Sequence, residues 1–386
     1  MHTGDSRAVN VAPTIRRTHC AACQSASISK LMLPPKDIMM PLLPICTDAP
    51  LEDDIFAPFG ICACESCGLI MLLDVVDPKH LYNNFHSDGI GETWCSHYDT
   101  FADLVNRHAI CGRVVEVGAG QGKLVERLKS TMISIDVIDP QYNGPKVNKV
   151  HSVLFGKSSV VPDYRYDALI SSHTLEHCID FNEFFVAAQE LLPEWGMIFT
   201  SVPNQEFGFS KGRGNSLNFE HPSVYTNVHL LAMHQTYGFA PTEVVMFKNH
   251  SVMIAATKHN ANRFLVRDDG HAKSLVDEYA SACLARQTAV MKLATEDKQN
   301  WLFGASNLSQ PLFAYGVDES LFSGVLDNSP LKHGKRLYGT ELMCNKPEDV
   351  IGKGKPVRVF LNVGEYNEEV AKQIERLDPS TERICL

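Results

Sequence analysis

The chain has 386 residues, a length that predicts two or three domains. Its composition, 44% hydrophobic and 21% charged, is that of an ordinary globular protein and excludes a disordered chain or a fibrous repeat. The 45 acidic residues outnumber the 35 basic ones, and the net charge of -10 argues against binding of nucleic acid through a broad basic surface.

The N-terminal residues and the cysteines indicate a cytoplasmic protein. Residues 1–7 are polar and lack an apolar signal core, and no apolar run approaches the roughly 18 residues of a membrane span. Twelve cysteines without a secretion signal favour a reducing compartment. We therefore expect a small-molecule substrate and neither a membrane nor a nucleic-acid partner; the sequence does not predict the oligomeric state.

Three parts are expected in chain order: a cysteine-rich module over residues 1–75, a central α/β domain over 76–260 and a smaller C-terminal α/β domain over 261–386. A helix is predicted in the second half of 77–108. After it, short apolar runs alternate with helical stretches, which is typical of βαβ units and a parallel sheet. The central strands are expected at 113–117, 133–138, 168–170 and 197–202, with a helix from Leu124 onward.

A second α/β series follows the central domain. One or two amphipathic helices over 260–300 are expected to connect the two domains. Strands are then predicted at 301–306, 321–326 and 357–363, and helices from Gln310 and over 368–377.

Two C-x-x-C pairs in the first module are typical of a metal site. Tetrahedral zinc prefers four soft ligands, and a C-x-x-C turn lets two thiolates converge on one ion. We expect a closed, structural Zn²⁺ site formed by Cys20, Cys23, Cys64 and Cys67. The alternatives are a disulfide, a redox pair and unpaired core cysteines, and His19 and Cys62 lie close enough in sequence to be competing ligands.

A glycine-rich loop follows the first central strand. Gly118, Gly120 and Gly122 let a ligand approach the backbone closely, and a following helix would offer N–H donors. Asp139 comes about 20 residues after Gly118, at the tip of the next strand, where a carboxylate can bind the hydroxyls of an adenosine ribose. A structural turn and a nicotinamide site are alternative interpretations of this loop.

Glu116, placed directly before this loop, resembles the first motif of the class I S-adenosylmethionine methyltransferases. The segment 166–177, which contains His173-Thr174-Leu175-Glu176-His177, is similar to that superfamily's fourth-strand motif. The resemblance implies S-adenosyl-L-methionine as cofactor and a Rossmann-like core. His173, Glu176 and His177 are expected to orient the cofactor pocket, with a catalytic role as the second interpretation.

The candidate chemistry lies in the loop after the fourth central strand. A histidine can act as a general base near neutral pH, and an adjacent carboxylate can hold its tautomer, so the Glu220-His221 pair is the base candidate. Lys211 and Arg213 can contact phosphate. A neutral surface histidine beside a glutamate is the alternative.

The double C-x-x-C module, the cofactor domain and the C-terminal α/β domain together resemble the nucleotide-sugar C-methyltransferases, notably the 3-C-methyltransferases of deoxysugar biosynthesis. The stretch 220–225 is similar to the family's E-H pair and its aromatic residue, which implies that His221, Glu220 and Tyr225 are catalytic. The stretch 326–340, with Lys332, is close to the family's C-terminal substrate segment. The implied fold is a class I methyltransferase core with an N-terminal zinc-binding module and a C-terminal Rossmann-like domain on the substrate side.

The implied reaction is carbon methylation of a nucleotide-linked keto-sugar. A 4-keto group acidifies the neighbouring C3–H, so His221 can remove that proton and leave an enolate. Two alternative functions remain: an O- or N-methyltransferase that acts on a sugar or small metabolite, and a non-catalytic scaffold that binds the cofactor.

The sequence departs from the family pattern at three places. Residues 83–88 replace a tyrosine motif of the family, and His86 is a substitute substrate contact there. Asn218 stands where the family often has a tyrosine, two residues before the E-H pair. The family's C-terminal glycine loop appears as residues 304–309, with neither its basic residue nor its second glycine. The substrate contacts expected from Lys211, Arg213, Asn218 and Lys332 therefore belong to a substrate that differs from the usual deoxysugar.

Overall fold

The structure is a computed structural model of the chain. It describes residues 10–31, 38–43, 45–81, 91–108, 110, 112–128, 134–156, 165–259, 266–267 and 270–386. His86, predicted to contact substrate, lies outside the described residues, as does the rest of 83–88.

A seven-stranded sheet with the order β12-β11-β10-β13-β14-β17-β16 is the largest element of the fold. The first five strands are parallel, and β17 is antiparallel to both of its neighbours. The strands are β10 (Arg113–Val117), β11 (Ser134–Ile138), β12 (Lys149–His151), β13 (Ala168–Ser172), β14 (Met197–Pro203), β16 (Phe239–Phe247) and β17 (Ser251–Lys258). The central strands predicted from the apolar runs are thereby confirmed.

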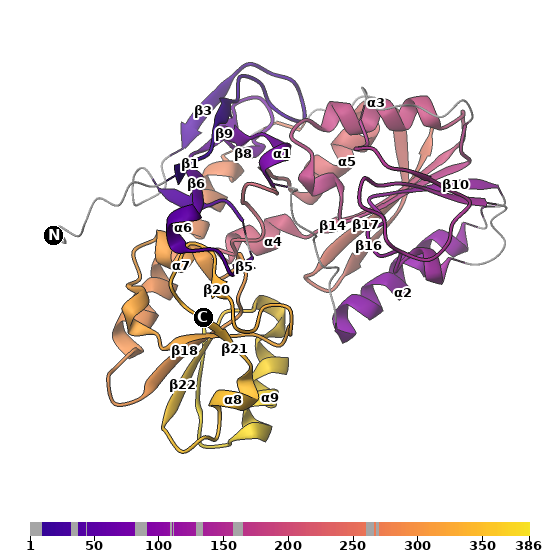
Figure 1. Ribbon diagram of the computed structural model, residues 1–386. Helices are drawn as coiled ribbons and strands as arrows, with labels where there is room; N and C mark the ends of the chain where they lie inside the picture. The colour runs from indigo at the N-terminus through magenta and orange to yellow at the C-terminus, as the bar shows by residue number, and fades with distance from the viewer. Residues whose placement is uncertain are drawn as a thin grey trace.

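Helices cover both faces of this sheet, as Figure 1 shows for α3 and α5 on one face and α2 on the other. Side chains alternate along β10: Val114 packs into the core beneath α2, whereas Val115 and Val117 pack into the core beneath α3. This burial on both faces explains the continuous apolar run in the strand. The helices of this region are α2 (Glu92–Arg107), α3 (Phe181–Leu191), α4 (Gln205–Ser210) and α5 (Asn227–Thr236).

The helix expected from Leu124 onward is wrong for the described residues. In its place stands one 3₁₀ turn, η2 (Val125–Arg127). Leu124 is buried in the core beneath α2, and Leu128 packs against that core. A single turn satisfies the apolar spacing of these two leucines, so the spacing alone did not require a longer helix.

The N-terminal region is built from short strands in small sheets. One sheet has the order β15-β8-β7-β3, another β1-β6-β4, and β2 pairs with β9. Their bounds are β1 (Asn10–Val11), β2 (Thr14–Arg16), β3 (Ile28–Leu31), β4 (Met39–Pro41), β6 (Ile55–Pro58), β7 (Ile61–Cys64), β8 (Ile70–Leu72), β9 (Asp74–Val76) and β15 (Ser223–Val224), followed by the short helix α1 (Pro78–Leu81). The strand β15 comes from the loop that carries His221, so this loop is attached to the cysteine-rich region by β-pairing.

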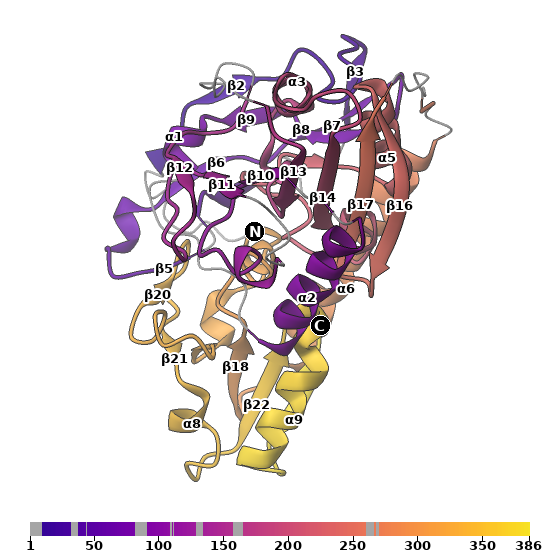
Figure 2. The ribbon, with the colours of Figure 1, turned by 90° about the vertical axis from the view of Figure 1, so that its right-hand side faces the viewer.

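The C-terminal region holds a five-stranded parallel sheet with the order β21-β19-β18-β22-β23. Figure 2 shows the helix α9 lying along β22 in the lower lobe. The strand expected at 321–326 is shorter because Glu319–Leu321 form the 3₁₀ turn η4. The elements are α6 (His271–Leu293), β18 (Gln299–Phe303), α7 (Gln310–Ala314), β19 (Gly324–Leu326), β20 (Arg336–Leu337), β21 (Cys344–Asn345), α8 (Pro347–Val350), β22 (Val357–Leu361), α9 (Asn367–Leu377) and β23 (Glu382–Cys385).

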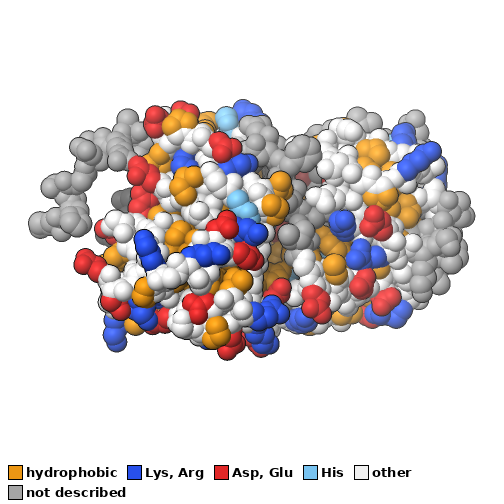
Figure 3. All heavy atoms as spheres, turned by 60° about the horizontal axis from the view of Figure 1, so that its bottom comes forward, with side chains coloured by type: hydrophobic (Ala, Val, Ile, Leu, Met, Phe, Trp, Pro, Cys, Tyr) orange, Lys and Arg blue, Asp and Glu red, His pale blue; other side chains and the backbone are white. Residues whose placement is uncertain are grey.

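Two further observations concern the surface. None of the helices in the described ranges combines the length and the apolar content that crossing a bilayer requires. On the face drawn in Figure 3, basic and acidic side chains of the described residues are interspersed and do not form one broad basic field. This mixture agrees with the acidic net charge of the chain.

Candidate functional site

The crevice expected for a ligand lies between β10 and β13. The chain runs from β10 outward through β11 and β12 on one side, and through β13 and β14 on the other. At such a point the loops that follow the two strands part and leave room at the carboxyl edge of the sheet. The glycine-rich loop follows β10, and the segment from His173 to His177 follows β13, so both predicted motifs meet at this edge.

The conformation of the glycine loop depends on its glycines. Gly118, Gly120 and Gly122 all have positive φ, of 72°, 53° and 72°. A Cβ on Gly118 would lie 2.1 Å from Oγ1 of Thr174, and one on Gly122 would lie 2.5 Å from Cδ of Pro145. Glycine is therefore required at both positions by the positive φ and by the close packing of Thr174 and Pro145 against the loop.

Asp139 stands directly after β11 and braces this loop. Its Oδ2 accepts a hydrogen bond from the backbone N–H of Gly120 at 2.9 Å, and its Oδ1 accepts one from Gln141 at 2.7 Å. The carboxylate is 8% exposed, and Glu116, at the end of β10, is 2% exposed. Both predicted acidic cofactor contacts thus lie beside the glycine loop.

Glu176 is a buried carboxylate surrounded by histidines. It is 1% exposed, and its Oε1 lies 3.1 Å from Nδ1 of His173. Burial opposes ionisation, but the neighbouring His173, His177 and His221 outweigh it and lower the pKa of Glu176 below its ordinary value. Glu176 therefore carries a negative charge at neutral pH and can stabilise a proton on the adjacent imidazoles.

His221 lies in contact with this group. Its ring centroid is 4.7 Å from that of His177, and one ligand atom of each of Glu176, His177 and His221 lies within 4.8 Å of the other two. Nδ1 of His221 lies 2.5 Å from the carbonyl oxygen of Asn215, and Nδ1 of His177 lies 3.1 Å from that of Glu220. A carbonyl oxygen can only accept, so in neutral His221 the proton sits on Nδ1 and Nε2 has the lone pair a base needs.

Asn218 shapes the loop that presents His221. Its Oδ1 accepts from the backbone N–H groups of Glu220 and His221 at 2.9 and 3.0 Å, and its Nδ2 donates to the carbonyl of Gly214 at 3.0 Å. This accounts for an asparagine at the position where the family pattern has a tyrosine. A contact between Asn218 and substrate stays a prediction.

Tyr225 is buried, with 1% of its surface exposed. Burial, together with the nearby Glu176 and Cys178, raises the pKa of Tyr225 well above its ordinary value. The hydroxyl therefore stays protonated, and it has no hydrogen-bond partner among the described residues. A buried phenol of this kind can donate a hydrogen bond but cannot serve as a base.

The basic candidates lie elsewhere. Lys211 and Arg213 line a cavity of about 230 Å³ together with Arg286, between α4, α6 and the carboxyl edge of the C-terminal sheet. Arg213 forms an ion pair with Glu365, and Lys332 bonds Oδ2 of Asp327 at 2.9 Å in the loop after β19. The residues lining the cavity include neither the glycine loop nor the histidines around Glu176.

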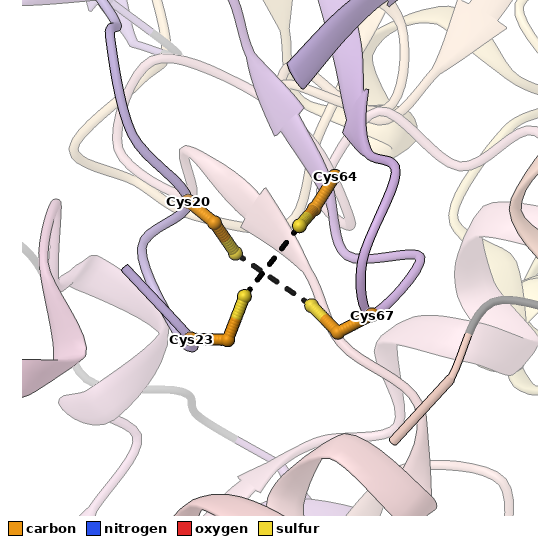
Figure 4. Close-up of side chains that lie close together, drawn as sticks. All are labelled: Cys20, Cys23, Cys64 and Cys67. Carbon is orange, nitrogen blue, oxygen red and sulfur yellow. Dashed lines mark hydrogen bonds between the residues drawn. The ribbon is translucent and has the colours of Figure 1, made fainter. Parts of the chain in front are cut away.

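The four predicted metal ligands converge (Figure 4). Sγ of Cys20 lies 3.6 Å from Sγ of Cys67, and Sγ of Cys23 lies 3.5 Å from Sγ of Cys64. Tetrahedral Zn–S bonds of about 2.3 Å place sulfur atoms about 3.8 Å apart, so the donor set fits one zinc ion. Cys62 is not a member of this group, and Nδ1 of His19 contacts the hydroxyl of Thr18 instead.

Some residues of the site carry no signal in the sequence. Asn215 acts through its backbone carbonyl, which any residue type provides. Thr174 contacts Gly118 because β10 and β13 are neighbours, and Arg286 reaches the cavity from a helix more than 70 residues after Lys211. Only the folded chain brings these groups to the residues that the motifs identify.

The chain was compared with known proteins in three ways. Residues 90–244 match the family model described as "Methyltransferase domain". None of the curated proteins compared matches the chain. Similar solved structures include an S-adenosylmethionine-dependent methyltransferase from Clostridium acetobutylicum ATCC 824, with 11% identity over 45% of this chain and 93% of that chain and a TM-score of 0.35. Another is the N-methyltransferase NodS from Bradyrhizobium japonicum WM9, with 11% identity over 43% of this chain and 97% of that chain and a TM-score of 0.35.

The family match and the sheet lead to one conclusion. The matched residues span α2 and the strands from β10 through most of β16, and they include the glycine loop and Glu176. Residues 90–244 therefore match a methyltransferase domain, and their strands belong to a sheet with the class I, Rossmann-like order.

Proposed function

We propose that the enzyme methylates a carbon atom of a nucleotide-linked keto-sugar, with His221 as the base. The observation that carries the proposal is the contact of His221 with His177 and the buried Glu176 carboxylate beside the glycine loop. Removal of a proton from carbon needs a base whose conjugate acid is stabilised, and Glu176 supplies that stabilisation. The substrate class rests on the resemblance of the sequence to the sugar C-methyltransferases.

The residues of the cofactor site fit S-adenosylmethionine. The positive φ of Gly118, Gly120 and Gly122 gives a loop of the kind that lets a ligand approach backbone, and Asp139, beside this loop, is proposed to bind the ribose hydroxyls. Glu116 is expected to lie near the amino-acid end of the cofactor. S-Adenosylmethionine supplies an electrophilic methyl group when bound.

The protein's own groups perform the other steps. The 4-keto group of the sugar makes the adjacent C–H acidic, and Nε2 of His221 takes that proton. Glu176 stabilises the resulting imidazolium, while Asn215 and Asn218 hold the loop so that the ring keeps its direction. Tyr225, protonated and buried near Glu176, is suited to donate a hydrogen bond to an oxygen that gains charge.

The anionic part of the substrate is proposed to bind away from the base. Lys211 and Arg213, with Arg286, form a basic lining at the cavity beside the C-terminal sheet, which suits a diphosphate. Lys332, in the loop after β19, is proposed as a further contact on the same sheet edge. The zinc ion proposed for Cys20, Cys23, Cys64 and Cys67 is structural, because all four ligands come from protein.

Incubation with S-adenosylmethionine and a panel of nucleotide 4-keto-sugars tests this function. Mass spectrometry reports methyl gain, and NMR of the product reports the methylated atom. A new carbon-bound methyl group supports the proposal. A methyl group on oxygen or nitrogen would replace it with the second candidate, in which His221 deprotonates a hydroxyl or amine, and cofactor binding without transfer to any member of the panel would favour a scaffold.

A further inference from the structure

Three histidines from separate segments meet at the carboxyl edge of the central sheet. His97 lies on α2, His173 follows β13, and His250 lies in the turn between β16 and β17. Their ring centroids are 5.0 Å apart for His97 and His173, 5.4 Å for His97 and His250, and 5.6 Å for His173 and His250. One ring nitrogen of each lies within 4.8 Å of the other two.

His97 has an unsatisfied nitrogen in this cluster. The residue is completely buried, and its Nε2 bonds the hydroxyl of Ser201 at 2.8 Å. Its Nδ1 has no hydrogen-bond partner among the described residues. A buried polar atom without a partner is costly, and a metal ion at the centre of the cluster would satisfy it.

Glu176 holds His173 at Nδ1, so the nitrogen that would bind an ion is Nε2, which contacts the Ser251 hydroxyl in this structure. Nδ1 of His173 faces Oε1 of the buried Glu176 at 3.1 Å, an arrangement in which a carboxylate holds the ring and raises its basicity. Nδ1 of His250 lies 2.5 Å from the hydroxyl of Ser251, which also lies 3.1 Å from Nε2 of His173. His173 adopts φ 51°, a conformation that a non-glycine residue seldom takes and that aims its ring into the cluster.

Trp94 packs over one side of the cluster. Its ring packs edge-on against His173 and His250, with centroids 4.8 and 4.7 Å away. An apolar wall of this kind strengthens the bonds between an ion and its ligands, because it excludes competing solvent.

We propose that His97, His173 and His250 bind a divalent transition-metal ion of the zinc type. Metal–nitrogen bonds of about 2.1 Å in tetrahedral directions place three imidazole rings about 5 Å apart, which is the spacing of this cluster. Three protein ligands leave a fourth position for water or a substrate oxygen, unlike the closed site of the four cysteines. The site adjoins the glycine loop through His173 and Thr174, so the substrate crevice is within reach of that open position.

Metal content of the full-length chain tests the proposal without any substrate. After zinc loading and desalting, the wild type is expected to retain zinc in both groups, the cysteines and the histidines. His250→Gln, which keeps a polar side chain in a half-buried place, is expected to lose one equivalent per chain and to keep its fold by circular dichroism. Glu176→Gln is expected to weaken the second equivalent by about 10- to 100-fold. The control is His259→Gln, an exposed histidine stacked on Trp195, which should retain both.

Cobalt distinguishes this site from the cysteines. The more weakly bound zinc equivalent, assigned to the histidines, is removed first, and Co²⁺ is then added. The wild type should show ligand-field bands without sulfur-to-cobalt charge transfer. His250→Gln should abolish these bands. A wild type that binds only the cysteine equivalent and shows no nitrogen-type cobalt spectrum would overturn the proposal. Loss of that spectrum in His221→Gln with retention in His250→Gln would also overturn it, because the ion would then belong to the Glu176–His177–His221 group.

Discussion

A backbone carbonyl, and not the side chain of the adjacent Glu220, sets the direction of the His221 ring. The carbonyl oxygen of Asn215 holds Nδ1, while the buried charge beside the ring comes from Glu176, a residue of a different loop. Glu220 contributes its backbone carbonyl to His177. The proposed base therefore depends on two loops at one sheet edge, those after β13 and β14.

At the same scale, position 118 requires glycine for two reasons: its φ is positive, and Thr174 leaves no room for a Cβ. Gly118→Ala places a Cβ 2.1 Å from Oγ1 of Thr174 at φ 72°, so we expect a loss of about 1–2 kcal/mol from the backbone alone and a larger loss of cofactor affinity. Isothermal titration with S-adenosylhomocysteine measures the affinity.

Gly354→Ala is the matched control for this change. Gly354 has φ 84° with nothing within 4 Å of the added Cβ, so it carries the backbone cost without the clash. Unchanged cofactor affinity in Gly118→Ala would show that the loop does not form the cofactor cradle.

At the scale of elements, one device occurs in both α/β sheets. Asp139 after β11 accepts from Gly120, and Asp327 after β19 accepts from the N–H of Ala305 at 3.0 Å. In each case the acid braces the loop that follows the neighbouring, earlier strand. In the C-terminal sheet Lys332 also bonds the carboxylate of Asp327.

The strand β7 offers a paired test of the zinc site. Cys64→Ser is expected to lose zinc and to cost about 4 kcal/mol or more of the free energy of unfolding, since loss of a structural metal is among the largest single-residue effects. Cys62→Ser, also fully buried on β7 but outside the cysteine group, should retain zinc. Zinc content and chemical denaturation report both. Equal zinc content in the two variants would contradict the assignment.

His234, on the helix α5, is expected to make the stability of the protein depend on pH. His234 is buried, donates from Nδ1 to the carbonyl of Leu230 and accepts at Nε2 from Thr200, and burial lowers its pKa from 6.5 to about 4. Because the unfolded chain binds this proton below pH 6.5 and the folded chain does not, stability is complete above pH 6.5 and falls as the pH drops toward about 4.

The change amounts to about 3 kcal/mol over that range. Urea denaturation of wild type and His234→Gln between pH 7 and pH 4 measures it. The variant should lose stability less steeply, by about 1.4 kcal/mol per pH unit. Parallel curves for the two proteins would contradict a neutral, buried His234.

At the scale of the whole molecule, pairings between distant segments join the three regions. The strand β15, beside His221, pairs with β8, and β5 (Cys46–Thr47) pairs with β20. A buried ion pair strengthens the second link: Nη1 and Nη2 of Arg336 bond the two carboxylate oxygens of Asp54, each at 2.6 Å. The C-terminal sheet is therefore anchored to the N-terminal strands.

Arg336→Met is expected to destabilise the protein by about 3–5 kcal/mol, because Asp54 is left as an uncompensated buried charge. Arg336→Lys should recover only part of this, since an ammonium cannot reproduce the two parallel bonds. The control is Arg16→Met, which removes the exposed pair with Asp74 and should cost less than about 1 kcal/mol. Similar midpoints of thermal unfolding for the two methionine variants would contradict the proposed link.

The sequence predicted the parts of the fold that are governed by local pattern. Apolar runs such as 113–117 and 168–170 identified strands because both faces of a parallel strand are buried. The helix predicted from Leu124 was wrong because two leucines a turn apart fit a single turn as well as a helix. The meeting of His97 with His250, or of Arg336 with Asp54, depends on the tertiary fold and leaves no pattern in the sequence.

Hydrogen exchange at the substrate carbon tests the central claim most directly. In heavy water with S-adenosylhomocysteine in the cofactor site, the wild type should exchange the C–H next to the 4-keto group of a nucleotide keto-sugar, since the base acts before methyl transfer. His221→Gln should exchange at least about 100-fold more slowly, and His259→Gln should match the wild type. Equal exchange by wild type and His221→Gln, with cofactor affinity intact in both, would contradict the role of His221 as the carbon base.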